Sequence, residues 1–86
     1  MTREEFIFTI GYDGDTAVVD KKSAQEYGKL STAELFDRGM IKAAVCSAVF
    51  SKDKGEEQLV LDKFNAIVSP PVESFDDLKK IFGVTA

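Results

Sequence analysis

The most apolar stretch of the chain covers residues 40–50, where Lys42 and Ser47 are the only polar side chains. A helix that is apolar almost all round is normally buried on most of its sides. The pattern therefore predicts a central buried helix at about 40–50, covered by the rest of the chain. A buried strand over 45–50 is the competing interpretation. Eleven residues that include three alanines favour the helix.

Apolar and other side chains alternate over residues 5–12 and again before residue 20, with Asp13-Gly14 between the two runs. This pattern predicts a β-hairpin over residues 5–20, since Asp-Gly is a favoured dipeptide for a two-residue loop. With that loop, one face of the hairpin carries Phe6, Phe8, Ile10, Ala17 and Val19. The opposite face then offers Ile7 and Val18 to solvent or to a partner.

The clearest helix start lies at Ser31, which forms a capping-box pattern with Glu34 and is flanked by Leu30 and Leu35 as a hydrophobic staple. A helix over 31–38 follows, and Gly39 either ends it or marks a bend. Capping residues and apolar spacing predict further helices over 54–68 and after Ser74. We expect Gly83 to stop the last helix in the left-handed conformation, with Val84 folding back onto it. A short helix over 21–28, capped by Asp20 and stopped by Gly28 in the left-handed conformation, competes with a basic loop.

These elements predict one small α+β domain over residues 1–86, with an N-terminal β-hairpin packed on a cluster of four to five helices. No apolar run approaches the roughly 20 residues that a membrane span needs. The acidic N-terminal sequence is unlike a secretory signal. The single cysteine, Cys46, excludes an internal disulfide and fits a reducing compartment, so we expect a cytoplasmic protein without membrane contact.

The composition argues against several kinds of chemistry. The chain has no histidine, the commonest general base and metal ligand, and Cys46 has no second cysteine with which to hold zinc. The runs Asp13-Gly14-Asp15-Thr16 and Gly28-Lys29-Leu30-Ser31 lack the further residues of a phosphotransferase, calcium or phosphate-binding loop. We therefore expect no enzymatic activity, no metal site and no cofactor.

Two functional hypotheses remain. The first is a non-enzymatic protein–protein interaction module whose partner is another protein or a second copy, contacted through Ile7 and Val18 of the hairpin. The second is a nucleic-acid-associated regulator with a helix-turn-helix-like core over 31–50. Its contacts come from the basic residues Lys21, Lys22, Lys29 and Arg38. The net charge of −4 makes nucleic acid the less favoured partner.

Overall fold

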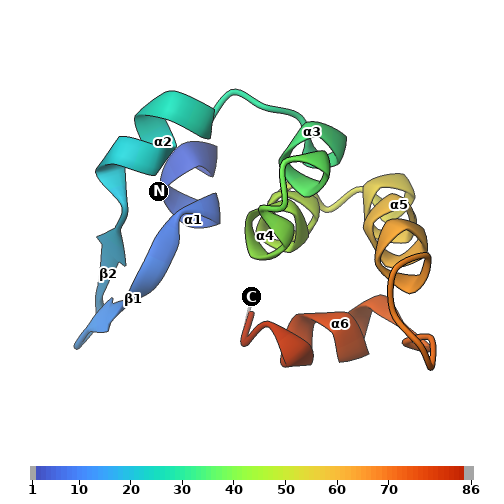
Figure 1. The fold of residues 1–86 in the computed structure, drawn as a ribbon. Coiled ribbons are helices and arrows are strands. Elements are labelled where there is room, and N and C mark those ends of the chain that lie inside the picture. The colour runs from blue at the N-terminus through green and yellow to red at the C-terminus, as the bar shows by residue number, and fades with distance from the viewer. Residues whose placement is uncertain (1, 85–86) are drawn as a thin grey trace.

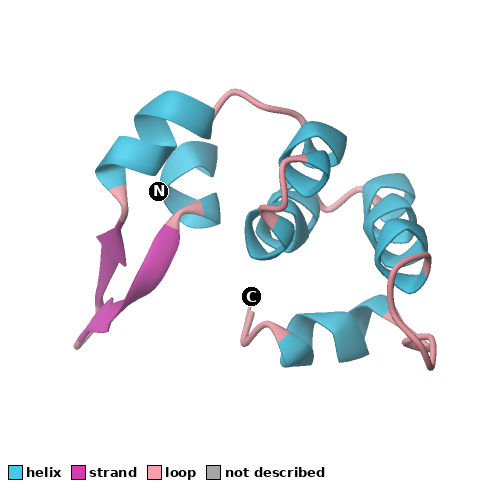
Figure 2. Ribbon diagram, in the orientation of Figure 1, coloured by secondary structure: helices cyan, strands magenta, loops and turns pink. Residues whose placement is uncertain are grey.

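The computed structural model describes residues 2–84 and has an α+β fold, as the sequence predicts. Helices and a single antiparallel hairpin make up this part of the chain (Figures 1 and 2). In chain order the elements are α1 (Arg3–Ile7), β1 (Thr9–Asp13), β2 (Thr16–Val19), α2 (Lys21–Tyr27), α3 (Thr32–Asp37), α4 (Ile41–Ser51), α5 (Lys54–Asn65) and α6 (Phe75–Ile81). The described range thus holds six helices, one or two more than predicted.

The central element is α4, which is a helix and not a strand. Every residue from Ala43 to Ala48 is buried, because α1, α3 and α5 all pack against this helix. Small side chains at 43, 44 and 48 allow these neighbours to approach closely. The largest fully buried side chains around it include Leu35, Val60 and Leu78, from α3, α5 and α6. The prediction of a central buried helix is confirmed.

The N-terminus corrects the predicted hairpin, because residues 3–7 form α1 and not a strand. Thr2 Oγ1 accepts a hydrogen bond from the Glu5 N–H, and Glu5 Oε1 accepts one from the Thr2 N–H. This capping box starts a helix where the alternating pattern indicates a strand. Ile7 ends that helix with only 3 % of its surface exposed. The prediction that Ile7 faces solvent or a partner is therefore wrong.

The hairpin loop also lies one residue later in the chain than predicted. Asp13 pairs with Thr16 and Tyr12 with Ala17, so the loop is Gly14-Asp15. Gly14 has a φ of 62° whereas Asp15 does not have a positive φ, which is the pattern of a type II′ turn with glycine first. A loop at Asp13-Gly14 would pair Tyr12 with Asp15, so the partner of Tyr12 moves by two residues along β2. Because side chains alternate with a period of two, this shift keeps each β2 side chain on its predicted face, and Val18 is exposed.

Helix boundaries follow the local signals closely. The Ser31–Glu34 capping box is present, and Gly39, with a φ of 83°, ends α3 rather than bending it. The Gly39 N–H donates to the Phe36 carbonyl and the Met40 N–H to the Leu35 carbonyl, which is the Schellman arrangement. At 21–28 the structure has the helix and not the loop, capped by Asp20 as predicted.

Gly28 ends α2 for a reason other than the predicted left-handed stop. Its φ is −65°, in the right-handed helical region that any residue adopts. A Cβ at this position would overlap the Glu4 side chain and the Ala24 carbonyl oxygen. Glycine is therefore needed here because α1 and α2 approach closely, not because of a positive φ.

The C-terminal helix α6 closes the open side of the core beside α5. The ring of Phe82, at the C-terminal end of α6, meets that of Phe64 edge-on with centroids 5.7 Å apart. The connecting loop is held by Asn65, whose side-chain amide exchanges two hydrogen bonds with the Val72 backbone at 2.8 and 2.9 Å. Gly83 is left-handed and the Val84 N–H donates to the Lys79 carbonyl, as the sequence predicts.

Candidate interaction surfaces

The hairpin is an exposed sheet of only two strands within residues 2–84, so neither strand has a second neighbour in this part of the chain. Ile10 is 68 % exposed and Val18 is 41 % exposed. Ile10 is the extra residue of a bulge, because Thr9 pairs with Val19 and Gly11 with Val18. Since Gly11 has no side chain, Val18 lacks a cross-strand contact on its own face. Of the two predicted hairpin residues, Val18 is exposed and Ile7 is not.

The predicted basic residues lie on different parts of the surface. Lys21 and Lys22 begin α2, and Lys29 follows its opposite end, roughly 10 Å away along the helix axis. Arg38 is the C-cap of α3. All four residues are exposed.

The α3–turn–α4 unit has the order of a helix-turn-helix, but α4 offers little to a DNA groove. A recognition helix presents polar side chains to base edges. The only described α4 side chains with polar groups in its first two turns are Lys42 and Ser47, and Ser47 is buried. The nucleic-acid hypothesis therefore stays a prediction without a matching surface on this helix.

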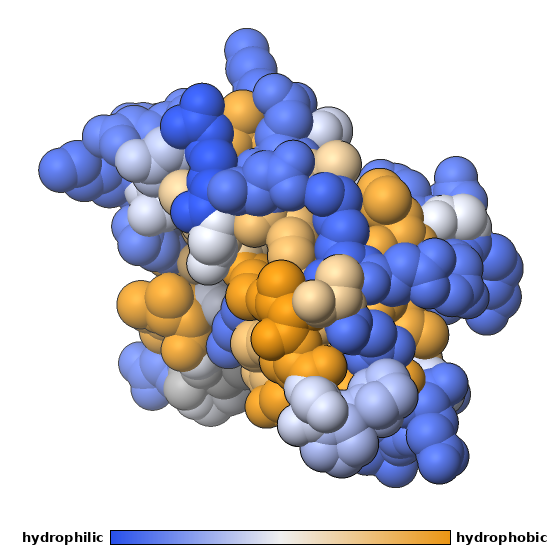
Figure 3. All heavy atoms as spheres, turned by 45° about the vertical axis from the view of Figure 1, so that its right-hand side comes forward, coloured by the Kyte–Doolittle hydropathy of each residue, from blue (hydrophilic) through white to orange (hydrophobic). Residues whose placement is uncertain are grey.

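A groove of about 680 Å³ lies where α1, the C-terminal end of α4 and the first turns of α5 and α6 meet. We call it the basic groove. It is lined by Phe6, Val49, Phe50, Lys52, Lys54, Glu57, Phe75 and Lys79. Figure 3 shows one face of the molecule, on which hydrophobic side chains gather in the centre and charged ones surround them.

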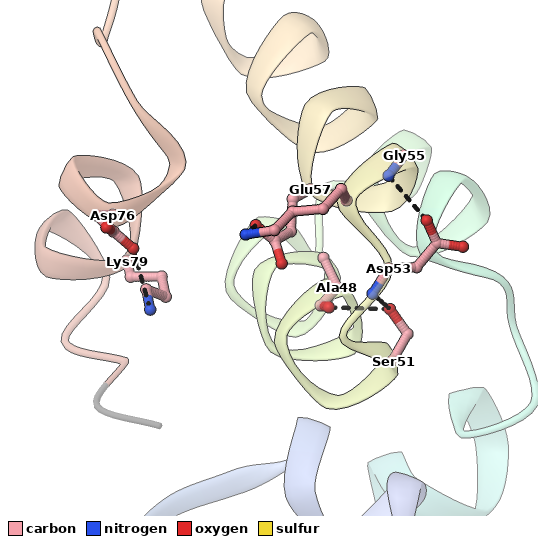
Figure 4. Close-up of polar contacts among 8 residues, drawn as sticks. Ala48, Ser51, Asp53, Gly55, Glu57, Asp76 and Lys79 are labelled. Atoms are coloured by element: carbon pink, nitrogen blue, oxygen red, sulfur yellow. Dashed lines mark hydrogen bonds and ion pairs between the residues drawn. The ribbon is translucent and has the colours of Figure 1, made fainter.

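Three lysines and one glutamate give the basic groove its charge. Within α5, Lys54 Nζ lies 3.6 Å from Glu57 Oε1. Within α6, Lys79 Nζ lies 3.3 Å from Asp76 Oδ1. Figure 4 shows the Asp76–Lys79 pair on α6 and Glu57 across from it on α5. Exposed pairs of this kind are weak and exchange readily with other partners. Lys52 makes no ion pair with any residue in the range 2–84.

Lys52 also has an unusual backbone. Its φ of 56° is the only positive value among the described non-glycine residues. A glycine normally occupies this left-handed position at a helix end, because other side chains are disfavoured there. A lysine at the C-terminal end of α4 gains some favourable interaction with the helix dipole. It also carries a charge to the edge of the basic groove.

A second hollow, of about 510 Å³, separates the base of the hairpin from the α3–α4 turn and the end of α6. Its lining is mainly apolar and includes Ile10, Met40 and Phe82. The charged residues along it, Asp20 and Lys42, have opposite signs. Asp20 is the one carboxylate in this lining, and its oxygens accept hydrogen bonds from the Ser23 N–H and hydroxyl in the cap of α2.

The buried polar residues form a structural chain and not a reaction centre. Ser47 Oγ lies 2.8 Å from Thr32 Oγ1, which donates to a Glu56 carboxylate oxygen at 2.6 Å. At the other end, the Arg3 guanidinium donates to Ser47 Oγ at 2.9 Å. Every buried side-chain nitrogen or oxygen among the described residues has a hydrogen-bond partner. The Glu56 carboxylate accepts the hydroxyl proton of Thr32, but Thr32 and Ser47 are each only 2 % exposed, so a substrate has no access to either hydroxyl.

Cys46 is buried in α4, and burial raises the pKa of its thiol. A raised pKa lowers the thiolate fraction and with it the reactivity of the sulfur. No group of three or more acidic, cysteine or histidine side chains in residues 2–84 could hold a metal ion. Within the same range, no helix is long and apolar enough to cross a membrane.

The sequence predicted Val18 as an exposed site but missed the basic groove. Phe6 is predicted as a strand residue and Phe50 as part of the buried helix, so neither is expected at a shared surface. Only tertiary packing brings α1, α4, α5 and α6 together around these rings. The one local signal is the lysine spacing of Lys52 and Lys54 directly after the apolar run.

Comparison with known proteins gives no relative from which a role can be transferred: no family model, no curated protein and no solved structure matches the chain significantly.

Proposed function

We propose that the protein is a non-enzymatic protein–protein interaction module that associates with a second copy of itself through the hairpin. The supporting observation is the exposure of Ile10 and Val18 on a two-stranded sheet. Two strands alone are marginally stable in water and gain from a further strand. Burying two such side chains against a partner removes apolar surface from water.

The edge of β2 is the better candidate for strand pairing. A bulge interrupts β1 at Ile10, and bulges hinder the addition of a further strand. β2 is regular from Thr16 to Val19 and alternates between exposed and half-buried side chains. Figure 1 draws β2 on the outside of the hairpin, away from the helices. Antiparallel pairing of two β2 edges gives a closed two-fold dimer.

The proposal places this association in the cytoplasm. One unpaired, buried cysteine suits a compartment that keeps thiols reduced. The hydroxyls of Ser47 and Thr32 and the Glu56 carboxylate bind one another inside the fold, so the proposal assigns them a structural role.

The test is sedimentation velocity of the wild type and of Val18→Lys over a range of protein concentrations. We expect a concentration-dependent dimer for the wild type and a monomer for Val18→Lys, because the dimer would bury two like charges. Val18→Thr keeps a β-branched side chain and should retain the dimer. Far-UV circular dichroism should be unchanged in both variants.

The matched control is Ile67→Lys, which puts the same charge at another exposed apolar position, beyond the end of α5. It should leave the dimer intact. A wild type that is monomeric at every concentration would overturn the proposal. So would a Val18→Lys variant that dimerises as strongly as the wild type.

A further inference from the structure

We infer that the basic groove binds an acidic peptide segment with large apolar side chains, supplied by a different protein. This inference shares with the proposed function the idea that the protein binds proteins. It concerns a separate surface and does not depend on dimerisation.

The floor of the basic groove is suited to apolar side chains. The rings of Phe6 and Phe50 meet at a tilt with centroids 5.6 Å apart, and Phe75 lines another wall. Phe50 leaves 41 % of its surface exposed although it belongs to the most apolar helix of the fold. Aromatic side chains at a partly exposed position supply large contact areas in protein interfaces.

The edge of the basic groove is suited to carboxylates. Lys52, Lys54 and Lys79 meet there from three elements, although the whole chain carries a net charge of −4. Glu57 is the only acidic residue in the lining, and its side chain is mostly covered. Local positive charge favours a partner of opposite sign, whereas two copies that met groove to groove would place the same lysines against one another.

The left-handed conformation of Lys52 adds an independent argument. Glycine at this position would relieve the backbone strain, and the strain at a non-glycine residue is a known mark of functional positions. The Lys52 side chain lines the basic groove and forms no ion pair with any of residues 2–84. The strained position thus supplies the one lysine of the groove that is free to pair with an incoming carboxylate.

A peptide fits the basic groove better than a small ligand or a nucleic acid. Small-ligand sites bury most of the ligand surface. This groove is open, since Phe50, Lys52 and Lys54 are all exposed. A nucleic acid needs several phosphate contacts, and the exposed acids elsewhere on the chain repel a long polyanion. A short acidic segment needs only the three lysines and the aromatic floor.

The experiment selects peptides from a random-peptide phage library on the immobilised wild-type protein. We expect the selected sequences to combine aspartate or glutamate with leucine or aromatic residues. A selected peptide, made synthetically and labelled, is then titrated with the wild type and with Lys52→Asn/Lys54→Gln/Lys79→Gln. Asparagine is chosen at 52 because it tolerates the left-handed region.

The groove variant should bind at least about tenfold more weakly, since three weak charge pairs are lost together. The control Lys21→Gln/Lys22→Gln/Lys29→Gln removes the same charge from α2 and should bind as the wild type does. Phe50→Ala should also weaken binding. Amide shifts of the labelled protein should change around residues 49–57 and 75–79. Thermal unfolding shows whether each variant is folded.

Three results would overturn the inference: no peptide enriched, peptides without acidic residues, or binding that is unchanged in the groove variant. Retention of a labelled DNA or RNA duplex by the wild type, lost in the groove variant, would assign the groove to nucleic acid instead. Val18→Lys should leave peptide binding unchanged. A negative result for dimerisation and a negative result for peptide binding can therefore be told apart.

Discussion

Ser47 Oγ lies 2.8 Å from Thr32 Oγ1 in the interior of the protein. Through this contact the Arg3 guanidinium is linked to the Glu56 carboxylate. Since Thr32 uses its proton on Glu56, Ser47 must donate to Thr32, and Arg3 in turn donates to Ser47. The chain of donors therefore has one direction, from guanidinium to carboxylate. It connects α1, α4, α3 and α5.

Arg3 extends this connection to the loop before α3. Its guanidinium also donates to the carbonyl oxygens of Gly28 and Leu30, at 2.6 and 2.7 Å. The N-terminal helix is thus fastened by charge-assisted hydrogen bonds as well as by the buried Ile7.

Replacing Ser47 by alanine should destabilise the fold. The change leaves Thr32 Oγ1 without a donor and removes one acceptor from Arg3, in a region where Ser47 is 2 % exposed. We expect a loss of about 1–3 kcal/mol, slightly reduced by the better helix propensity of alanine. Urea unfolding followed by circular dichroism measures it. Thr32→Ser keeps the hydroxyl and should cost less; equal stability of Ser47→Ala and wild type would contradict the role of the chain.

Replacing Gly28 by alanine should also destabilise the fold, because the new Cβ meets the Ala24 carbonyl and Glu4. Overpacking of this kind costs about 1–3 kcal/mol. The matched control is Gly11→Ala, where no atom lies within 4 Å of the added Cβ. Chemical unfolding of both variants is the measurement. A Gly28→Ala protein as stable as Gly11→Ala would show that α1 and α2 separate easily.

The free energy of unfolding should fall in acid as the carboxylates of the two capping boxes, Glu34 and Glu5, become protonated. The Ser31 N–H bound to Glu34 lowers the pKa of that carboxyl, and the Thr2 N–H does the same to Glu5. A lowered pKa in the folded state means that the stabilisation is complete above the unfolded value of 4.5. It is lost as the pH falls from there through the lowered folded value.

The variant Glu34→Gln tests this assignment. Glutamine keeps the capping hydrogen bond but does not titrate. Its unfolding free energy should therefore decline less steeply than that of the wild type between about pH 4.5 and the acid end of the curve. Parallel curves for the two proteins would rule out a contribution of Glu34 to the acid sensitivity.

Cys46 should react slowly with a thiol reagent in the folded protein. Desolvation raises its pKa, and the residue is only 6 % exposed. The reaction rate with a disulfide reagent at neutral pH should be far below that of free glutathione, and should rise once urea unfolds the protein. A native rate close to that of glutathione would mean that α4 opens frequently.

Local sequence signals located most of the elements correctly. The Ser31–Glu34 box, the Asp20 cap and the Gly83 stop act within a few residues, so their outcome does not depend on the rest of the fold. The apolar run over 40–50 likewise requires burial wherever it is placed. These signals made the α+β class and the central helix predictable.

Other features depended on competition between two local signals or on packing between distant parts of the chain. The Thr2–Glu5 capping box overrode the alternating pattern at Phe6 and Ile7, and the type II′ turn at Gly14 moved the hairpin loop by one residue. The sequence therefore determined the helix caps and the buried centre, because these depend on neighbouring residues. Only the tertiary structure decided that Ile7 is buried and that distant lysines and phenylalanines share one groove, because both depend on how α1 and α6 dock against α4 and α5.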